Sequence, residues 1–502
     1  MARIPFNAIV GAPASDGVTV VVVALDNGAM TWELAGQSGT VTLTKWADDR
    51  SPAIPSGPRA GQTWAGYTGS FTVSGLTLQS LSQLTGTITQ AGVTLTVAFR
   101  AIPVKGDKFR IINSTCYDPQ TDGGFYGYMA ADMFSTDTVS IPIACAVHND
   151  DIGYVDTQLV DDLTGTGHQS TGDPATTNLL YDFAVAWMLR LGLIGDGITA
   201  YEARYFSELN HLMVPGSHER TDLSSGGATW NTLFTHCHGT AFSAPLVSLP
   251  YVWQKALGDY KFVVVDGEGL VANTDTVLDT LNNLNTSEGI KFVLRTRPIP
   301  WRAMSAVGVL RWSEGDTRLL YASGQTPKSI SDNPLLNGVK GVCVVINGDR
   351  HNASFTTYAE PAGAGTVAEK FALWMCGGTT SGGHLGADGA VKEAPDYIRV
   401  DNYPEGTVTS NATIVYKVNI DPNTGLGPLY YDPRGPQQSW TRITCYGDEY
   451  PATVMMEFRR ANLSGVVYSA FTRHFTAQGL TDNYGSATPV RKEQVSVSSG
   501  DE

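Results

Sequence analysis

The chain has 502 residues and a formal net charge of −15 at pH 7, from 33 Lys and Arg against 48 Asp and Glu. This length accommodates two or three domains, and the composition excludes a fibrous, collagenous or wholly disordered protein. The acidic balance, without a basic run to follow a phosphate backbone, argues against general nucleic-acid binding. No apolar stretch is long enough to cross a bilayer, so we expect no membrane span.

Residues 1–105 have the texture of an all-β domain. The Val-rich run near the start is short and interrupted by Gly and Asp, which indicates a β-strand, and no signal peptide is evident. Residues 69–99, GSFTVSGLTLQSLSQLTGTITQAGVTLTVAF, alternate short strand candidates with turns. We predict an N-terminal β-sandwich of the immunoglobulin or fibronectin type III kind over residues 1–105.

The pattern changes over residues 106–402, where helix patterns alternate with apolar strand runs. The helix candidates are LLYDFAVAWMLRLGLI and AYEARYFSELNHL, and the strand candidates are KFVVVDG, IKFVLRT and GVCVVIN. This alternation predicts an α/β domain. Residues 403–485 return to a β pattern and are expected to form a segment that completes the α/β domain, and residues 486–502 form a polar tail that is flexible or holds a partner.

Candidate functional residues follow the ends of the predicted strands, where loops present side chains on a rigid support. Cys116 follows one apolar run; its thiolate is a metal-ligand candidate, although a single cysteine is more often a small core residue. AVHNDDIGYVD brings His148 together with Asp151 and Tyr154, a set that suits a cation or is a solvated acidic turn. The six cysteines lack paired spacing, which favours free thiols or isolated ligands over disulfides.

Two further segments have the same placement. LMVPGSHERTD puts His218 after a strand-like run, where the alternative is a plain turn. VVINGDRH ends in Asp349 and His351, which share a face of an extended segment and point at one site. His236 and His238 have the same spacing in FTHCHGTAF and are either a ligand pair or an ordinary polar turn.

The order of these segments over residues 107–355 resembles the alkaline phosphatase D (PhoD-like) family of metallophosphoesterases, which place a β-sandwich before the catalytic domain. STC at 114–116 resembles the family's Ser-Cys segment, HNDDIGY its Gly-Asp-x-x-Tyr loop, and INGDRH its Ser-Gly-Asp-x-His ending. GGFYGYMAADM is similar to the family's helix before the strand that leads to the Gly-Asp-x-x-Tyr loop. The resemblance implies a metallophosphoesterase-like αββα sandwich, so the expected class is α/β with flanking all-β segments.

The resemblance also implies a site and a reaction. Cys116, Asp151, Tyr154, Asp349 and His351 would hold one or two metal ions, iron or calcium or another divalent cation, and thiolate with phenolate favours iron(III). A metal-bound hydroxide would attack a phosphate ester, either a monoester or a diester. His218 and Arg350 are the implied catalytic residues, and Arg297 and Ser217 would bind the substrate.

Two departures from the family pattern weaken the expected second metal. Gly216 and Ser217 stand where the family has Asp-Asp, and a hydroxyl is a poorer ligand than a carboxylate. Asp150 replaces a Gly, so Asp150, His236 or His238 would have to compensate.

The alternative function is structural. Abundant Gly, Thr and Ser, few Lys and Arg, and β-rich flanks suit a virion-associated protein of a phage tail, neck or capsid, or a cell-surface protein, carrying a modified phosphoesterase-like domain. A homo-oligomer or a particle assembly would then be its context. The sequence does not indicate a cellular compartment. Metal-dependent turnover would favour the enzyme, whereas a stable oligomer or association with particles would favour the structural function.

Overall fold

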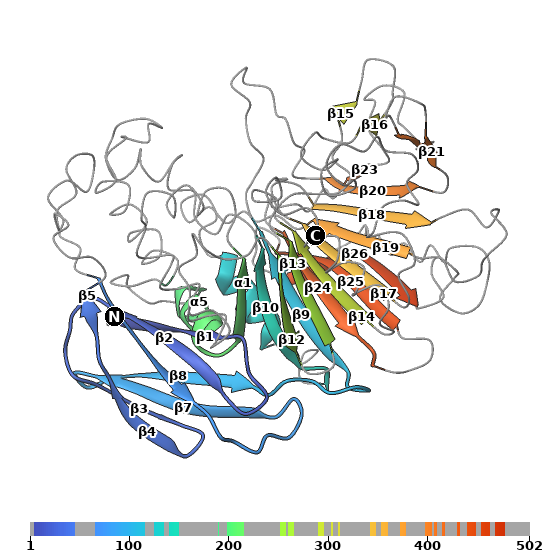
Figure 1. Cartoon of the computed structure of the whole chain (residues 1–502). Coiled ribbons are helices and arrows are strands. Elements are labelled where there is room, and N and C mark those ends of the chain that lie inside the picture. The colour runs from blue at the N-terminus through green and yellow to red at the C-terminus, as the bar shows by residue number, and fades with distance from the viewer. Residues whose placement is uncertain are drawn as a thin grey trace, which may run out of the picture. The chain divides into compact units, whose positions relative to one another are not determined.

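The structure is a computed structural model of the whole chain (Figure 1). It describes residues 5–45, 66–115, 125–134, 140–149, 189, 198–214, 252–257, 260–265, 290–295, 303–304, 310–311, 342–347, 353–359, 372–377, 397–403, 406–408, 414–416, 429–431, 439–447, 453–461 and 467–476. The chain divides into two compact units. The first unit comprises Met1–Pro103 and Cys116–Leu249, and the second comprises Val104–Thr115 and Pro250–Glu502.

The first unit contains a four-stranded antiparallel sheet in the order β4-β3-β7-β8. Its strands are β3 (Met30–Leu34), β4 (Gln37–Val41), β7 (Gln83–Gln90) and β8 (Val93–Arg100). Side chains alternate between a buried and an exposed face, as a half-buried sheet requires. Threonine occupies the exposed row in which Thr31 pairs with Thr40 and Thr89, and Thr89 with Thr94. The β-branched side chains favour the pleated backbone there.

Two tight turns close the hairpins of this sheet. Ala35-Gly36 joins β3 to β4, and Ala91-Gly92 joins β7 to β8. All four residues have positive φ, 54° and 78° in the first turn and 50° and 82° in the second. Two-residue turns with positive φ at both positions match the right-handed twist of the strands.

A second sheet of the first unit has the order β10-β11-β1-β2-β6-β5. Its strands are β1 (Phe6–Gly11), β2 (Val18–Ala24), β5 (Thr44–Lys45), β6 (Tyr67–Val73), β10 (Ile143–Asn149) and β11 (Asn210–Val214). Every residue of β1, β2, β10 and β11 is buried. Such continuous apolar runs are typical of strands that are covered on both faces.

The core of the first unit lies between the two sheets. Phe6, Val20 and Phe71 from one sheet and Ile88 and Phe99 from the other belong to one buried cluster. Trp32 stacks on Phe71, with ring centroids 4.3 Å apart and an interplanar angle of 10°. The N-terminal β-sandwich that the sequence predicts is therefore confirmed as a β-sandwich region.

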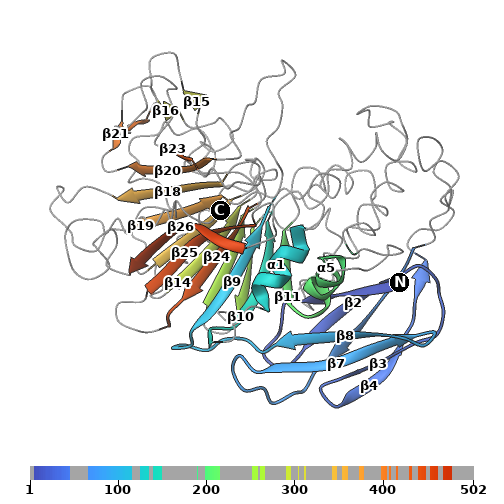
Figure 2. The ribbon, with the colours of Figure 1, turned by 180° about the vertical axis from the view of Figure 1, so that it is seen from behind.

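The opposite face of β1 is covered by a helix. Helices α1 (Phe125–Met133) and α5 (Ile198–Ser207) lie next to each other (Figure 2). The buried Asn7 of β1 donates from Nδ2 to the carbonyl oxygens of Leu189 and Ala203, at 3.1 and 3.3 Å. A buried amide needs such partners. They tie the start of β1 to the helical layer.

A network of hydrogen bonds around Arg100 and Asn210 connects β8 of the sandwich to β10 and β11. Asn210 of β11 donates to the carbonyl oxygens of Arg100 and Ala144, at 2.7 and 3.0 Å, and accepts from the Arg100 amide. The Arg100 guanidinium donates to the carbonyls of Leu81 and Ile143. Burial lowers the pKa of Arg100. These bonds join β8 to β10, 43 residues later in the chain, and to β11, 110 residues later.

The second unit contains an eight-stranded sheet in the order β12-β13-β14-β17-β19-β18-β20-β23. Its strands are β12 (Val252–Leu257), β13 (Tyr260–Val265), β14 (Ile290–Arg295), β17 (Val342–Asn347), β18 (Ala353–Ala359), β19 (Ala372–Gly377), β20 (Tyr397–Tyr403) and β23 (Leu429–Tyr431). The neighbours β13, β14, β17 and β19 are parallel.

Four more strands of the second unit follow the order β26-β25-β24-β9 and are antiparallel. They are β9 (Phe109–Ser114), β24 (Ser439–Cys445), β25 (Thr453–Ala461) and β26 (Val467–Thr476). Two short hairpins complete the described strands: β15 (Ala303–Met304) with β16 (Leu310–Arg311), and β21 (Gly406–Val408) with β22 (Ile414–Tyr416).

The described part of the chain is mostly β-sheet, with α1 and α5 as its only helices of eight residues or more. The apolar runs KFVVVDG, IKFVLRT and GVCVVIN form strands as predicted, and GGFYGYMAADM contains α1. The helix predicted over LLYDFAVAWMLRLGLI lies outside the described residues, apart from position 189. The αββα arrangement and the domain boundaries at 105 and 402 stay predictions. No helix of the described segments is long and apolar enough to span a membrane.

Candidate functional site

All nine site residues predicted from the sequence lie outside the described residues: Cys116, Asp151, Tyr154, Ser217, His218, Arg297, Asp349, Arg350 and His351. His236 and His238 also lie outside them. The structure does describe the strands that lead into these segments. The candidate site is therefore built from strand ends and from the side chains that hold them.

Predicted ligands follow directly after described strands. β9 ends at Ser114, two residues before Cys116, and β10 ends at Asn149, two residues before Asp151. In the same way, β11 ends at Val214 ahead of Ser217 and His218. β14 ends at Arg295 ahead of Arg297, and β17 ends at Asn347 ahead of Asp349. A segment two residues long spans at most about 7 Å, so the strand ends constrain where these residues can reach.

Two pairs of these strands are parallel neighbours. In the first unit β10 pairs with β11, with His148 opposite Met213 and Asn149 opposite Val214. In the second unit β14 pairs with β17, with Arg295 opposite Asn347. The carboxyl ends of parallel neighbours lie at one edge of a sheet, which is where open α/β sheets bind ligands.

A buried histidine pair lies at the end of β10 in the first unit. His148 Nε2 is 3.0 Å from His211 Nδ1, and His211 Nε2 is 3.0 Å from the carbonyl oxygen of Tyr205. A carbonyl only accepts, so His211 donates from Nε2 and its Nδ1 is the acceptor. His148 must then donate from Nε2, which leaves the ring lone pair of His148 on Nδ1. One hydrogen-bond chain fixes both tautomers.

Both imidazoles are held neutral. Burial lowers the pKa of His211 from its ordinary 6.5 to about 3, against the opposing effect of the Tyr205 carbonyl. Burial also lowers the pKa of His148 well below its ordinary value, and the nearby His211 adds to this. Desolvation disfavours the charged form of an imidazole, so both rings are neutral at physiological pH.

Aromatic side chains of α5 enclose the pair. Phe206 stacks on both imidazoles, with centroids 5.9 Å from His148 and 5.1 Å from His211. The Tyr205 ring meets both at steep angles, and its hydroxyl lies 3.5 Å from His148 Nε2. Phe206 and Tyr205 therefore cover the rings from the helical layer and fix how β10 and β11 meet α5. The arrangement positions the strand end that precedes Asp151.

Sequence reasoning placed His148 beside the acidic loop but did not single out His211. The signal for His211 is a histidine at the start of the apolar run HLMV, which also fits a plain core residue. The two residues are 63 positions apart and meet only because β10 and β11 pair.

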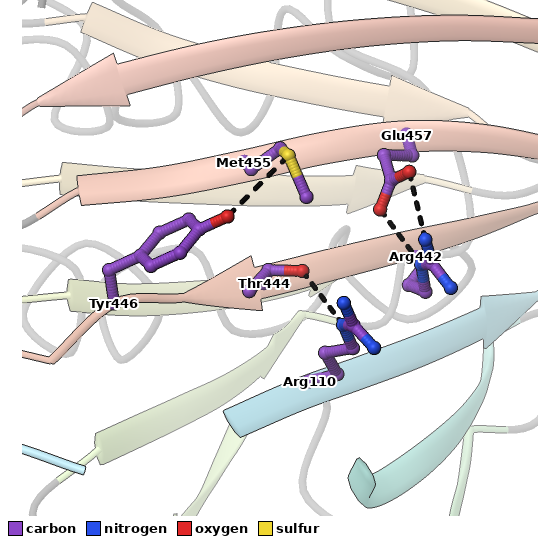
Figure 3. A network of polar contacts seen from close by, with 6 residues as sticks. All are labelled: Arg110, Arg442, Thr444, Tyr446, Met455 and Glu457. Atoms are coloured by element: carbon purple, nitrogen blue, oxygen red, sulfur yellow. Dashed lines mark hydrogen bonds and ion pairs between the residues drawn. The ribbon is translucent and has the colours of Figure 1, made fainter. Parts of the chain in front are cut away.

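In the second unit, polar groups cross one face of β9, β24 and β25 (Figure 3). The guanidinium of Arg442 donates to both carboxylate oxygens of Glu457, at 2.8 and 3.0 Å, and both side chains are buried. Arg110 Nε donates to Thr444 Oγ1 at 3.3 Å, and the Tyr446 hydroxyl lies 3.7 Å from Met455 Sδ. The two hydrogen bonds between Arg442 and Glu457 neutralise and pair both buried charges. We therefore assign this ion pair a structural role.

The first unit also has a small cavity beside Arg100. Its volume is about 60 Å³, and its walls include Arg100, Phe134, Glu208 and Asn210. Small-molecule pockets begin near 300 Å³, so this cavity is too small to hold a substrate. Arg204 pairs with Glu208 at its edge and covers the ring of Phe134 at 3.7 Å.

Within the described residues, no three His, Cys, Asp or Glu side chains are grouped so as to hold a metal ion. Cys145 and Cys445 are buried and form no disulfide, and burial raises the pKa of the Cys445 thiol, which makes it unreactive. The described fold thus defines a β-rich protein with candidate chemistry at parallel strand ends. No family model matches the chain, and no curated protein matches it.

Proposed function

We propose that the chain is a metal-dependent phosphoesterase that hydrolyses a phosphate monoester or diester. One observation carries the proposal: five segments predicted to hold metal or substrate each begin within three residues of the carboxyl end of a strand. Four of these strands form two parallel pairs, β10 with β11 and β14 with β17. If these segments were distributed by chance, some of them would precede strands or lie in hairpin turns instead of following strand ends.

The donor set suits the proposed metal. Cys116, Asp151, Tyr154, Asp349 and His351 would hold it, as a thiolate, two carboxylates, a phenolate and an imidazole, a combination that matches iron(III) with a divalent partner. When bound, the metal would lower the pKa of water to supply a nucleophile at neutral pH and would neutralise the phosphate charge. The αββα arrangement of the family is part of this proposal.

The remaining residues would act on the substrate. Arg350 and Arg297 would bind phosphate oxygens through charge-assisted hydrogen bonds. His218 would protonate the leaving group or hold the phosphate, and Ser217 would donate to it. In the first unit, the neutral pair of His148 and His211 holds the end of β10, from which Asp151 follows.

Metal analysis and hydrolysis assays on the purified full chain test the proposal. We expect bound iron or calcium, and turnover of p-nitrophenyl phosphate or its bis ester that Asp349→Ala and His351→Ala reduce at least a hundredfold. Glu33→Ala is the matched control, because Glu33 is an exposed carboxylate of the N-terminal sheet. A metal-free, inactive parent that forms a stable oligomer would instead support the structural, particle-associated function.

A further inference from the structure

One buried amide of the second unit has neither of its polar atoms hydrogen-bonded. Asn113, on β9, is fully buried, and both its Nδ2 and Oδ1 lack a partner. Among the described residues, it is the only side chain with two such atoms. Because both ends of the amide are unpaired, the conclusion does not depend on which end is nitrogen.

The strand register places Asn113 on the apolar face of β9. Side chains alternate along a strand, so Asn113 shares a face with Phe109 and Ile111. Asn113 pairs with Thr441 of β24, and Ile111 pairs with Ile443. Phe109, Ile111 and Ile443 are all fully buried. Asn113 is thus a polar group at the end of an otherwise apolar row, and its neighbour across the strands does not satisfy it.

This apolar face packs on the eight-stranded sheet. The Phe109 and Tyr260 rings pack in a T-shaped arrangement, with centroids 4.6 Å apart and planes at 71°. The Tyr260 hydroxyl lies 3.5 Å from the carbonyl oxygen of Asp107. Phe109 begins β9 and Tyr260 begins β13, so the starts of the two strands touch. Packed sheets commonly keep their strands within about 30° of one another.

Asn113 therefore lies between the layers, toward the edge where strands end. Asn113 is four positions after Phe109 on β9, a distance of about 13 Å at 3.3 Å per residue. On the sheet side, Tyr260 shares its face with the row that includes Phe292 and Val344, both fully buried. The ends of β14 and β17, which precede Arg297 and Asp349, belong to this same sheet.

We propose that Asn113 is a substrate-binding residue whose amide donates hydrogen bonds to oxygens of the bound phosphate group. The inference rests on the proposed phosphoesterase function. A carboxamide donates without adding negative charge, which suits an anionic ligand on a chain of net charge −15. Buried polar groups are normally paired, so the unpaired amide of Asn113 calls for a partner, and a bound phosphate would supply acceptor oxygens for it.

Binding of inorganic phosphate to the full, metal-loaded chain tests the proposal by titration calorimetry. We expect Asn113→Leu to weaken phosphate binding about tenfold, the loss of one good hydrogen bond, and Asn113→Asp to weaken it further by repulsion. The thermal midpoint of Asn113→Leu should stay unchanged or rise, since an unpaired amide is removed. Asn113→Ala provides a smaller replacement if leucine does not fit.

Ile111→Val is the matched control, because it changes packing on the same face of the same strand without touching a polar group. It should leave phosphate affinity unchanged. Phosphate affinity within twofold of the parent in Asn113→Leu or Asn113→Ala would overturn the inference, because the amide would then hold water or nothing.

The two proposals fail separately. A parent that hydrolyses phosphate esters, with Asn113 variants of unchanged affinity, refutes the role of Asn113 alone. A parent that binds phosphate through Asn113 but has no hydrolytic activity refutes the phosphoesterase function alone. A parent that does not bind phosphate refutes both.

Discussion

The neutral pair of His148 and His211 gives the first unit an acid-sensitive point. The pKa of His211 in the fold is about 3, below its ordinary 6.5. Between these values the unfolded chain takes up a proton that the fold excludes, so the free energy of unfolding falls as pH decreases below 6.5. Above 6.5 neither state carries the charge, and the contribution is complete. The direction is the same for His148.

His211→Gln tests this dependence. Glutamine keeps a donor toward the Tyr205 carbonyl but does not titrate, so the variant should lose about 1.4 kcal/mol of pH dependence per unit between pH 5.5 and 4. Urea unfolding at several pH values gives the free energy of unfolding of parent and variant. The contributions of the carboxylates that both proteins share cancel in the difference. Equal slopes for the two proteins would show that His211 accepts a proton within the fold.

The buried ion pair of Arg442 and Glu457 should contribute to the stability of the second unit. Both groups are buried, so Arg442→Met should leave a carboxylate without its counter-charge and lower the free energy of unfolding by about 3 to 5 kcal/mol. The double variant Arg442→Met with Glu457→Leu should recover most of this loss, because an apolar pair needs no compensation. Chemical denaturation of the parent, the two single variants and the double variant gives the coupling free energy between Arg442 and Glu457. A double variant as unstable as the single one would contradict the assignment.

The hairpin turn between β7 and β8 contains an alanine in a left-handed conformation. Ala91 holds a φ of 50° in the turn between β7 and β8, a left-handed conformation that costs an L-residue about 1 kcal/mol or more. Asparagine tolerates this conformation and is preferred before glycine in such turns. The exposed turn lies away from the core, so its substitution tests the backbone alone.

We therefore expect Ala91→Asn to raise the free energy of unfolding by about 0.5 to 1 kcal/mol and Ala91→Val to lower it. Thermal unfolding of both variants checks the opposite signs. Ala35→Asn, in the equivalent turn between β3 and β4, provides a repeat of the test at a second site. Stabilisation by valine would mean that the turn has a different backbone conformation in solution.

The elements themselves were largely predictable, while their pairing was not. VTVVVVA and GVCVVIN form strands because continuous β-branched runs favour the extended backbone. Nothing local indicates that Val10 pairs with Asn210, two hundred residues later. Asn113 follows an apolar run like any strand-end residue, and only its buried, unpaired amide distinguishes it. Register and burial depend on the whole fold, so the strand ends can be predicted from local patterns, whereas the roles of His211 and Asn113 cannot.

For the whole molecule, the proposed metal should act as a stabilising ligand. A ligand that binds only the folded state at a hundred times its Kd contributes about 2.7 kcal/mol. Adding calcium or iron to metal-depleted protein should therefore raise the Tm of the parent and of Glu33→Ala, and much less that of Asp349→Ala. Differential scanning calorimetry measures the shift. The same shift in all three proteins would place the metal away from Asp349.

The position of β1 has a consequence for shortening the chain. β1 lies between β2 and β11 in the sheet, and Asn7 reaches carbonyls at positions 189 and 203. A protein that begins at residue 106 would leave β11 with an open edge, and its backbone groups would template pairing with other chains. Expression of the later segments alone is therefore expected to yield aggregates. A peptide with the sequence of β1, supplied in trans, is the natural rescue.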